Sequence, residues 1–294
     1  MTRIRSVPHF IRALVLCLPY LLARCAPVDA LNATIPLDGL VVDPAVRYAP
    51  GPRGLMDVYR PAHPPGSALL PVVVFFYGGA WQDGRRQDYK FVAADLARRG
   101  MVVVVPDYRL YPEVRFPVFL RDAAAAVAAA RRSAALWGGD PRRVLLAGHS
   151  AGAWIAAMLA LDPQWLAAAG DSRDRIAGMV GLAGPYDFLP LVGADIKAVF
   201  ATADADLRVT QPIDFVDGHN PPMLLLAGDD DHTVYPRNTT ALAARIKAAG
   251  GDVADHLYPG LAHIGIVLSI APLFQFRAPV LNDMSRFLLA QPPR

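Results

Sequence analysis

Short apolar runs alternate with longer segments of helical periodicity along most of the chain. The continuous runs at 72–76 and 101–105 are rich in valine and phenylalanine and predict buried strands. Alanine-rich segments such as 118–136 predict helices, and glycines follow several of them. By these criteria we expect strands at 55–59, 72–76, 101–105, 144–147, 176–182, 223–227 and 253–258, and helices at 87–99, 118–136, 151–161, 236–249 and 279–290.

This order of elements predicts the α/β class. Strands that alternate with helices of this length form a mostly parallel central sheet with helices on both faces. One domain over residues 35–294 accounts for all of these elements. The one long insertion, 184–221, lies between two predicted strands and is expected to form a small cap.

The composition of the chain indicates a globular protein and argues against nucleic-acid binding and cysteine chemistry. The chain has 294 residues, of which 54% are hydrophobic and 19% charged, so it is expected to fold as a globular protein. Its formal net charge is +3, and no basic run is interleaved with aromatic residues, so nucleic acid is not an expected partner. Both cysteines, Cys17 and Cys25, lie within the first 30 residues, which leaves the remainder without a thiol nucleophile or disulfide.

The N-terminus has the pattern of a targeting segment. Arg3, Arg5 and Arg12 precede the apolar stretch 13–23, which is too short for a helix to span a bilayer. We therefore expect residues 1–30 to act as a signal-like segment and the protein to be exported, periplasmic or secreted. Cys25 makes a lipid anchor the alternative, with membrane attachment through the N-terminus only, although a lipoprotein signal has a small residue where Arg24 stands.

The strongest chemical motif is Gly148-His149-Ser150-Ala151-Gly152, between a predicted strand and a predicted helix. A serine at such a sharp turn is lifted clear of the sheet, and glycines two residues away on either side let the strand and helix pass closely. The motif alone also fits an ordinary loop serine. The nucleophile interpretation therefore depends on whether a base, an acid and oxyanion donors are present.

Candidates for the base, the acid and the oxyanion donors each follow a predicted strand. A serine nucleophile needs a base, a group that orients the base, and donors for the oxyanion. His263 follows the last strand in a glycine-flanked loop and is the expected base. Asp229, Asp230 and Asp231 all follow the strand 223–227, and spacing alone leaves the three open.

Oxyanion donors are expected in Tyr77-Gly78-Gly79-Ala80-Trp81, directly after the strand 72–76. Glycines there allow backbone N–H groups to turn inward. We expect the donors among Gly78, Gly79 and Ala80, with Gly79 and Ala80 preferred, together with the N–H of Ala151 after the nucleophile.

These motifs resemble the α/β-hydrolase superfamily, in particular the group of bacterial carboxylesterases, hormone-sensitive-lipase-like enzymes and formylkynurenine formamidases. The resemblance runs from about residue 57 to 287 and includes Pro106-Asp107-Tyr108-Arg109-Leu110 and Gly139-Asp140-Pro141. It aligns the segment 228–234 with the family's Gly-x-x-Asp-x-x-Val, which selects Asp231 as the triad acid. Tyr77 departs from the family because a histidine normally opens the oxyanion loop, and its phenol is expected to hold the loop by a hydrogen bond.

The resemblance implies a serine carboxylesterase that works through an acyl-enzyme, without cofactor or metal. Esters of short to medium acyl length are expected because the insertion 184–221 is too small for a large lid. The expected substrate is a small-molecule ester. An arylformamidase is the alternative enzyme, and a non-catalytic envelope binding protein is the alternative outside enzymes. The sequence leaves open the natural substrate and the oligomeric state. Aromatic residues of the oxyanion loop and the insertion are candidates for substrate binding, although they also fit an ordinary core: Trp81, Tyr186, Phe188 and Phe215.

Overall fold

The computed structural model describes residues 27–64, 66 and 68–294. The chain divides into two compact units, Met1–Pro36 and Leu37–Arg294. In the first unit, the described part consists of a short helix and the turn that follows it. Most of the signal-like segment, Cys25 included, lies outside the described residues. None of the helices in the described ranges is both long enough and apolar enough to cross a membrane.

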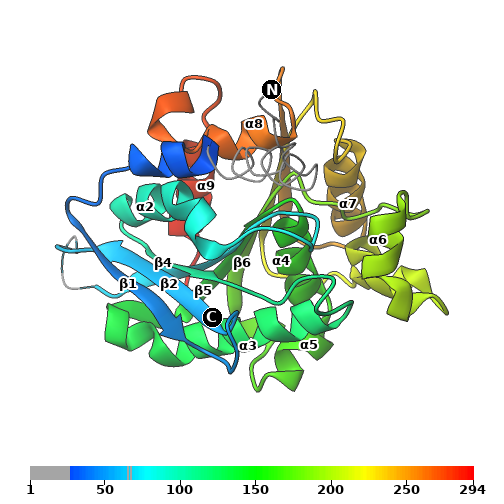
Figure 1. Ribbon diagram of the computed structural model, residues 1–294, viewed down its shortest axis with the longest axis horizontal. Coiled ribbons are helices and arrows are strands. Elements are labelled where there is room, and N and C mark those ends of the chain that lie inside the picture. The colour runs from blue at the N-terminus through cyan, green and yellow to red at the C-terminus, as the bar shows by residue number, and fades with distance from the viewer. Residues whose placement is uncertain (1–26, 65, 67) are drawn as a thin grey trace, which may run out of the picture. The chain divides into compact units, whose positions relative to one another are not determined.

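The second unit is built on an eight-stranded sheet with the order β1-β2-β4-β3-β5-β6-β7-β8 (Figure 1). β1 pairs with β2 and β2 with β4 in antiparallel fashion, and all other neighbours are parallel. The predicted α/β class with a mostly parallel sheet is confirmed. The strands are β1 (Leu40–Arg47), β2 (Leu55–Pro61), β3 (Leu70–Phe76), β4 (Val102–Pro106), β5 (Gly139–His149), β6 (Ile176–Leu182), β7 (Met223–Gly228) and β8 (Val253–Tyr258).

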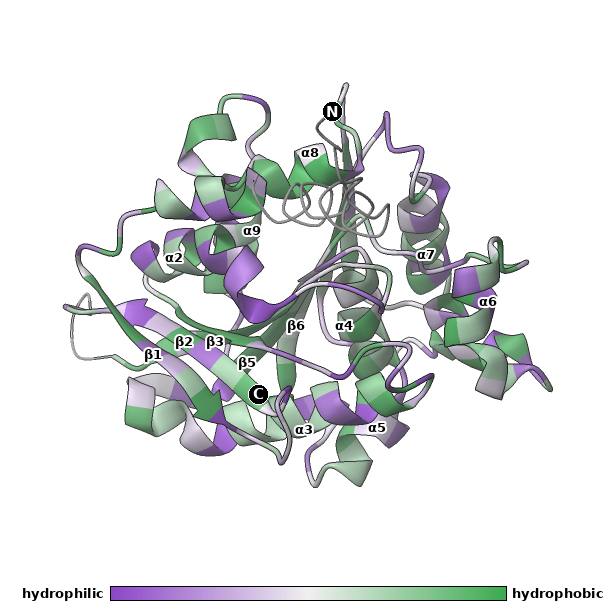
Figure 2. Cartoon of the chain, in the orientation of Figure 1, coloured by the Kyte–Doolittle hydropathy of each residue, from purple (hydrophilic) through white to green (hydrophobic). Residues whose placement is uncertain are grey.

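The central strands are apolar because helices cover both faces of the sheet. Every residue of β3, β4, β6 and β7 is buried, and Figure 2 shows hydrophobic colour along the middle of the sheet. α2 packs on β2 and β4 and against α9, whereas α3 and α4 pack on β5 and against each other (Figure 1). The helices are α2 (Lys90–Arg98), α3 (Val118–Ser133), α4 (Ala151–Leu161), α5 (Pro163–Ala168), α6 (Ala194–Val199), α7 (Arg237–Ala248), α8 (His263–Leu268) and α9 (Val280–Ala290).

Several predicted boundaries shift, and each shift has a local cause. The predicted helix 87–99 is a 3₁₀ turn, η1 (Arg86–Tyr89), followed by α2. The predicted helix 118–136 ends at Ser133 and continues as a 3₁₀ turn that closes at Gly138, whose φ is +75°. β1 was not predicted because Asp43-Pro44 interrupts its apolar run and a bulge breaks its register there.

The insertion 184–221 contains α6 and three 3₁₀ turns, and none of its residues belongs to a strand. It is tied to the sheet domain by hydrogen bonds from the Phe116 N–H to the Val199 carbonyl, 3.0 Å, and from Trp154 Nε1 to the Thr210 carbonyl, 2.8 Å. The insertion therefore lies against α4, the helix that follows Ser150.

Candidate active site

Ser150 occupies a strained turn between β5 and α4. Its φ is 55° and its ψ is −122°, a backbone conformation that non-glycine residues rarely adopt. The turn places the serine at the carboxyl end of β5, where the sites of parallel sheets lie. This strained geometry is the one expected for a nucleophile between a strand and a helix.

The glycines around Ser150 are required by close backbone contacts. A Cβ atom on Gly148 would lie 2.3 Å from the Gly152 carbonyl oxygen. A Cβ atom on Gly152 would lie 2.1 Å from the carbonyl oxygen of Phe76 in β3. Both distances are far below van der Waals contact, so the crossing of strand and helix at Ser150 excludes any side chain at these two positions.

The structure brings Ser150, His263 and Asp231 into one hydrogen-bonded line. Oγ of Ser150 lies 2.9 Å from Nε2 of His263, and Nδ1 of His263 lies 2.7 Å from Oδ2 of Asp231. Asp231 and His263 are buried, whereas Ser150 is partly exposed. His263 is the first residue of α8 and not part of a loop, which corrects the prediction for its local structure.

Backbone contacts distinguish Asp231 from its two neighbours. Its Oδ1 accepts hydrogen bonds from the N–H groups of Thr233, 2.9 Å, and Val234, 2.8 Å. Burial raises the pKa of Asp231, but the hydrogen bonds from His263 and these N–H groups outweigh it, so the pKa lies below its usual value. By contrast, Asp229 accepts the Gly260 N–H, and Asp230 is an exposed residue paired with His232.

The oxyanion loop after β3 is held in an unusual conformation. Gly79, Ala80 and Trp81 have φ values of 124°, 53° and 60°. A Cβ atom on Gly79 would lie 2.1 Å from the Asp83 carbonyl oxygen, so glycine is required there. Within the described part of the chain, no hydrogen bond uses the N–H groups of Gly79 and Ala80. The N–H of Ala151 is in the first turn of α4, where helices offer no internal acceptor.

Gly78 does not fit its predicted role. Its N–H donates to the phenol oxygen of Tyr89 at 3.1 Å, so it is not free to bind an oxyanion. The prediction that Gly78 supplies an oxyanion donor is wrong because Tyr89, eleven residues further along the chain, already occupies that N–H group.

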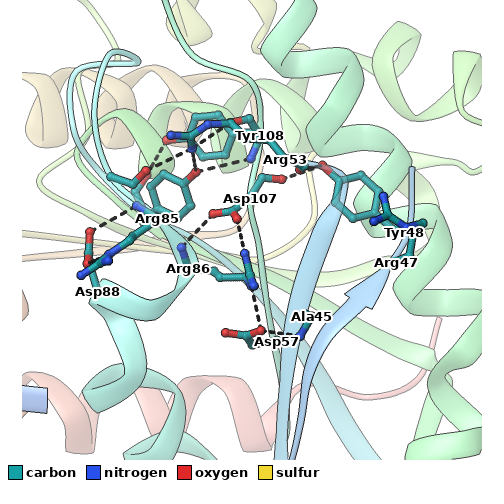
Figure 3. Close-up of polar contacts among 12 residues, drawn as sticks. Ala45, Arg47, Tyr48, Arg53, Asp57, Arg85, Arg86, Asp88, Asp107 and Tyr108 are labelled. Atoms are coloured by element: carbon teal, nitrogen blue, oxygen red, sulfur yellow. Dashed lines mark hydrogen bonds and ion pairs between the residues drawn. The ribbon is translucent and has the colours of Figure 1, made fainter. Parts of the chain in front are cut away.

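The Tyr77 phenol forms a hydrogen bond, as expected, and acts as the acceptor in it. Its phenol oxygen accepts from Nη1 of Arg53 at 3.0 Å, and its ring stacks on Tyr108 with centroids 4.5 Å apart. The Tyr108 hydroxyl in turn donates to the Tyr77 carbonyl at 2.8 Å. Burial raises the pKa of Tyr77 well above its usual value, so the phenol stays neutral. Arg53 and Tyr108 are thus the residues that position the start of the oxyanion loop (Figure 3).

The four predicted substrate-binding residues separate into two groups. Trp81 is buried and its ring lies against Phe188 and Phe200, with centroids 6.1 and 4.8 Å away. Phe188 is partly exposed. Tyr186, however, is fully buried against Gly181 and Gly184, and Phe215 has no ring contact with any described residue of this cluster. The structure therefore brings Trp81 and Phe188 together and does not bring Tyr186 or Phe215 to them.

A buried ion-pair network lies beside the oxyanion loop. Arg86 in η1 contacts Asp57 of β2 and Asp107 after β4, and the exposed fractions of the three side chains are 11%, 6% and 6%. Figure 3 shows Arg86 between the two carboxylates. Among the residues that the structure describes, no three histidine, cysteine or acidic side chains gather into a metal-binding group.

The sheet order, the strained serine turn and the line of serine, histidine and aspartate define an α/β-hydrolase. The sequence model of the BD-FAE family matches residues 56–246, about two thirds of the chain. The chain belongs to this family.

Comparisons with individual proteins agree with this class. The chain is 33% identical over 244 residues to the probable isoprenylcysteine alpha-carbonyl methylesterase ICMEL2 of Arabidopsis thaliana, covering 76% of this chain and 57% of the relative. It is 30% identical over 237 residues to esterase LipC of Mycobacterium tuberculosis, covering 74% and 58%. The chain thus spans little more than half the length of these curated relatives.

A solved structure shares the fold. Esterase B from Lactobacillus rhamnosis, inhibited by a tributyrin phosphonate, superimposes with a TM-score of 0.77 at 21% identity and covers 96% of each chain.

Proposed function

We propose that this protein is a serine carboxylesterase that hydrolyses short- to medium-chain carboxylic esters through an acyl-enzyme. The observation that carries the proposal is the hydrogen-bonded line from Ser150 through His263 to Asp231. The similar proteins described above, which include an esterase and a probable methylesterase, support the same class of reaction.

In the first step, Ser150 Oγ attacks the ester carbonyl while Nε2 of His263 accepts its proton. Asp231 keeps Nδ1 of His263 protonated and stabilises the imidazolium that forms. The N–H groups of Gly79, Ala80 and Ala151 bind the oxyanion of the tetrahedral intermediate. The intermediate collapses when the imidazolium gives its proton to the leaving alcohol, which leaves an acyl group on Ser150.

In the second step, His263 accepts a proton from water, which attacks the acyl-enzyme. The same three N–H groups bind the second oxyanion. Collapse releases the carboxylic acid, and the proton returns to Ser150.

The aromatic residues near the oxyanion loop support a limited acyl length. Trp81 directly follows Ala80, and Trp154 lies one helical turn after Ser150, with its ring centroid 5.2 Å from that of Trp81. Phe200 packs on both rings, and Phe188 is the partly exposed member of the cluster. We propose that this cluster closes the acyl side of the site and that Phe188 contacts the acyl chain.

The test is a substrate profile of the purified protein. We expect hydrolysis of nitrophenyl esters with highest kcat/KM between acetate and octanoate, and a fall for longer acyl chains. N-formylkynurenine is measured alongside, and a higher kcat/KM for this amide would replace the esterase proposal by an arylformamidase. No turnover of any ester or formamide by protein with an intact fold would contradict both.

We also propose that residues 1–30 direct export, on the basis of the arginines before the apolar stretch 13–23. Mass spectrometry of the protein from its native host tests this proposal. A mature N-terminus beyond residue 23 supports export, and a lipid-modified Cys25 supports the anchored form. An intact N-terminus in the cytosol would contradict both.

A further inference from the structure

Two polar side chains outside the triad connect the oxyanion loop to the proposed base. Tyr89, the last residue of η1, accepts the Gly78 N–H with its phenol oxygen at 3.1 Å. The same oxygen lies 2.9 Å from Nδ1 of His149, and Nε2 of His149 lies 3.1 Å from the backbone carbonyl oxygen of His263. A bridge of two side chains thus runs from Gly78 to His263.

The chemistry of these groups assigns every proton in the bridge. A carbonyl oxygen can only accept, so Nε2 of His149 must carry hydrogen and donate to His263. In the neutral ring Nδ1 then has a lone pair, and the Tyr89 hydroxyl must donate to it. The Tyr89 oxygen keeps lone pairs for the Gly78 N–H. All four polar groups are satisfied in one arrangement, which fixes the tautomer of His149.

The surroundings keep both groups in the required state. His149 is 1% exposed, and burial together with the nearby His263 ring lowers its pKa to about 3. Burial likewise raises the pKa of Tyr89, so its hydroxyl retains its proton. A Cβ atom on Gly78 would lie 3.0 Å from Cβ of Ser150 and 3.1 Å from Nδ1 of His149. Gly78 therefore lies directly against both residues.

The segment that carries Tyr89 is itself fixed to the sheet. Arg86 begins η1, its Nε lies 2.7 Å from Oδ1 of Asp57, and its backbone N–H donates to Oδ1 of Asp107 at 2.8 Å (Figure 3). These carboxylates come from two neighbouring strands, β2 and the end of β4. The Tyr89 hydroxyl is thus held at one place relative to the sheet.

We propose that Tyr89 and His149 are positioning residues for the hydrolytic reaction: they hold the oxyanion loop and the base His263 at a constant separation. The inference rests on the proposed function. The Gly79 and Ala80 donors follow Gly78 directly, and His263 holds the imidazole that must reach Ser150. Loss of the bridge lets the two halves of the site move independently, which weakens stabilisation of the transition state more than binding of the ester.

The test replaces the Tyr89 hydroxyl and keeps its ring. Tyr89→Phe retains the ring contacts with Phe75 and Phe91 and removes only the bridge. We expect kcat for nitrophenyl butyrate to fall about tenfold with little change in KM. Tyr258→Phe is the control, since it also removes a buried phenol hydroxyl, which donates to Oδ2 of Asp283 at 2.7 Å, but lies outside the bridge. Equal kcat in the two variants would overturn the proposal.

A double-mutant cycle separates positioning from general destabilisation. His149→Gln keeps an amide donor for the His263 carbonyl and removes the Nδ1 acceptor. If Tyr89 and His149 act through one bridge, the double variant should be no slower than the slower single variant. Losses in kcat that multiply would contradict the bridge. If the wild-type protein hydrolyses no ester at all, the proposed function fails, whereas an active wild type with unaffected variants contradicts only the positioning role.

Discussion

Oδ2 of Asp231 lies 2.7 Å from Nδ1 of His263, while Oδ1 of the same carboxylate accepts two backbone N–H groups. Both oxygens of the carboxylate are thus hydrogen-bonded. The carboxylate cannot rotate without losing these bonds, so it holds the imidazole in one orientation and one tautomer.

We predict that Asp231→Asn lowers kcat by roughly three to four orders of magnitude, because an amide can donate to Nδ1 and favour the wrong tautomer. Steady-state hydrolysis of nitrophenyl butyrate measures the effect. Asp230→Asn is the control, since the Asp230 carboxylate is exposed and lies beside His232, outside the triad, and it should retain nearly full activity. If Asp229→Asn lowers kcat more than Asp231→Asn does, the assignment of Asp231 as the triad acid is wrong.

Ser150→Ala and His263→Ala should each lower kcat by about five to six orders of magnitude, and the double variant should be no slower than either. The two residues act in one proton transfer, so their effects do not add. Mass spectrometry after incubation with a nitrophenyl phosphonate should find one adduct, on Ser150. Labelling of another serine, or unchanged labelling in Ser150→Ala, would contradict the assignment of the nucleophile.

Acid should destabilise the fold through His149. In the folded state His149 stays neutral until pH falls to about 3, whereas a histidine in the unfolded chain binds a proton below about pH 6.5. Between these values the unfolded state carries the extra proton, so this contribution to stability is complete above pH 6.5 and is lost as pH falls.

For His149 alone, the free energy of unfolding should decrease by about 2 kcal/mol between pH 7 and pH 5. Urea unfolding of the wild type and His149→Gln over this range measures the contribution as the difference between their slopes. The His149 ring faces the Tyr89 hydroxyl, the His263 carbonyl and the His263 ring, whose centroid is 5.0 Å away. All three groups are present in both proteins, so the difference between the slopes reports His149. If the free energy of unfolding has the same pH dependence in both proteins, the folded state does not lower the pKa of His149, and this prediction is wrong.

Gly152→Ala should lower the free energy of unfolding by about 3 kcal/mol or more, because its Cβ would lie 2.1 Å from the Phe76 carbonyl oxygen. The matched control is Gly265→Ala in α8, where the nearest atom is 3.7 Å away. That variant should be stabilised by roughly 0.5 kcal/mol through its helix propensity. Urea unfolding of the two variants and the wild type measures these changes. Equal stability of the two variants would contradict the close contact between β3 and α4.

Phe188→Ala should raise kcat/KM for nitrophenyl octanoate relative to butyrate by about tenfold, because removal of the ring lengthens the acyl side of the site. Phe215→Ala should leave this ratio unchanged, since no ring contact joins Phe215 to the Trp81 cluster in the described structure. If Phe215→Ala changes the ratio and Phe188→Ala does not, the acyl chain follows a different side of the insertion.

Features that depend on neighbouring residues could be predicted from sequence, and those that depend on distant ones could not. The apolar runs at 72–76 and 176–182 identified β3 and β6 because strands buried on both faces carry no polar alternation. Ser150 was recognisable because the glycine spacing of its turn is a local steric requirement.

Contacts between distant segments were not predictable in this way. The Gly78 N–H was expected to face the oxyanion, yet it binds Tyr89, whose position depends on η1 and on carboxylates from two strands. Tyr186 was expected to line the site, but its ring fills space left by Gly181 and Gly184 in the core. The spacing of residues in the chain contains no information about either packing arrangement.

The ion pair between Asp57 and Arg86 also limits how far the chain can be shortened. β2 supplies Asp57, although it is an antiparallel strand near the edge of the sheet and contributes no residue to the triad. A fragment that starts after β2 would leave the buried guanidinium with one carboxylate instead of two, and the η1 turn would lose its attachment to that edge. The smallest active fragment must therefore retain β2, even though every proposed catalytic residue follows it in sequence.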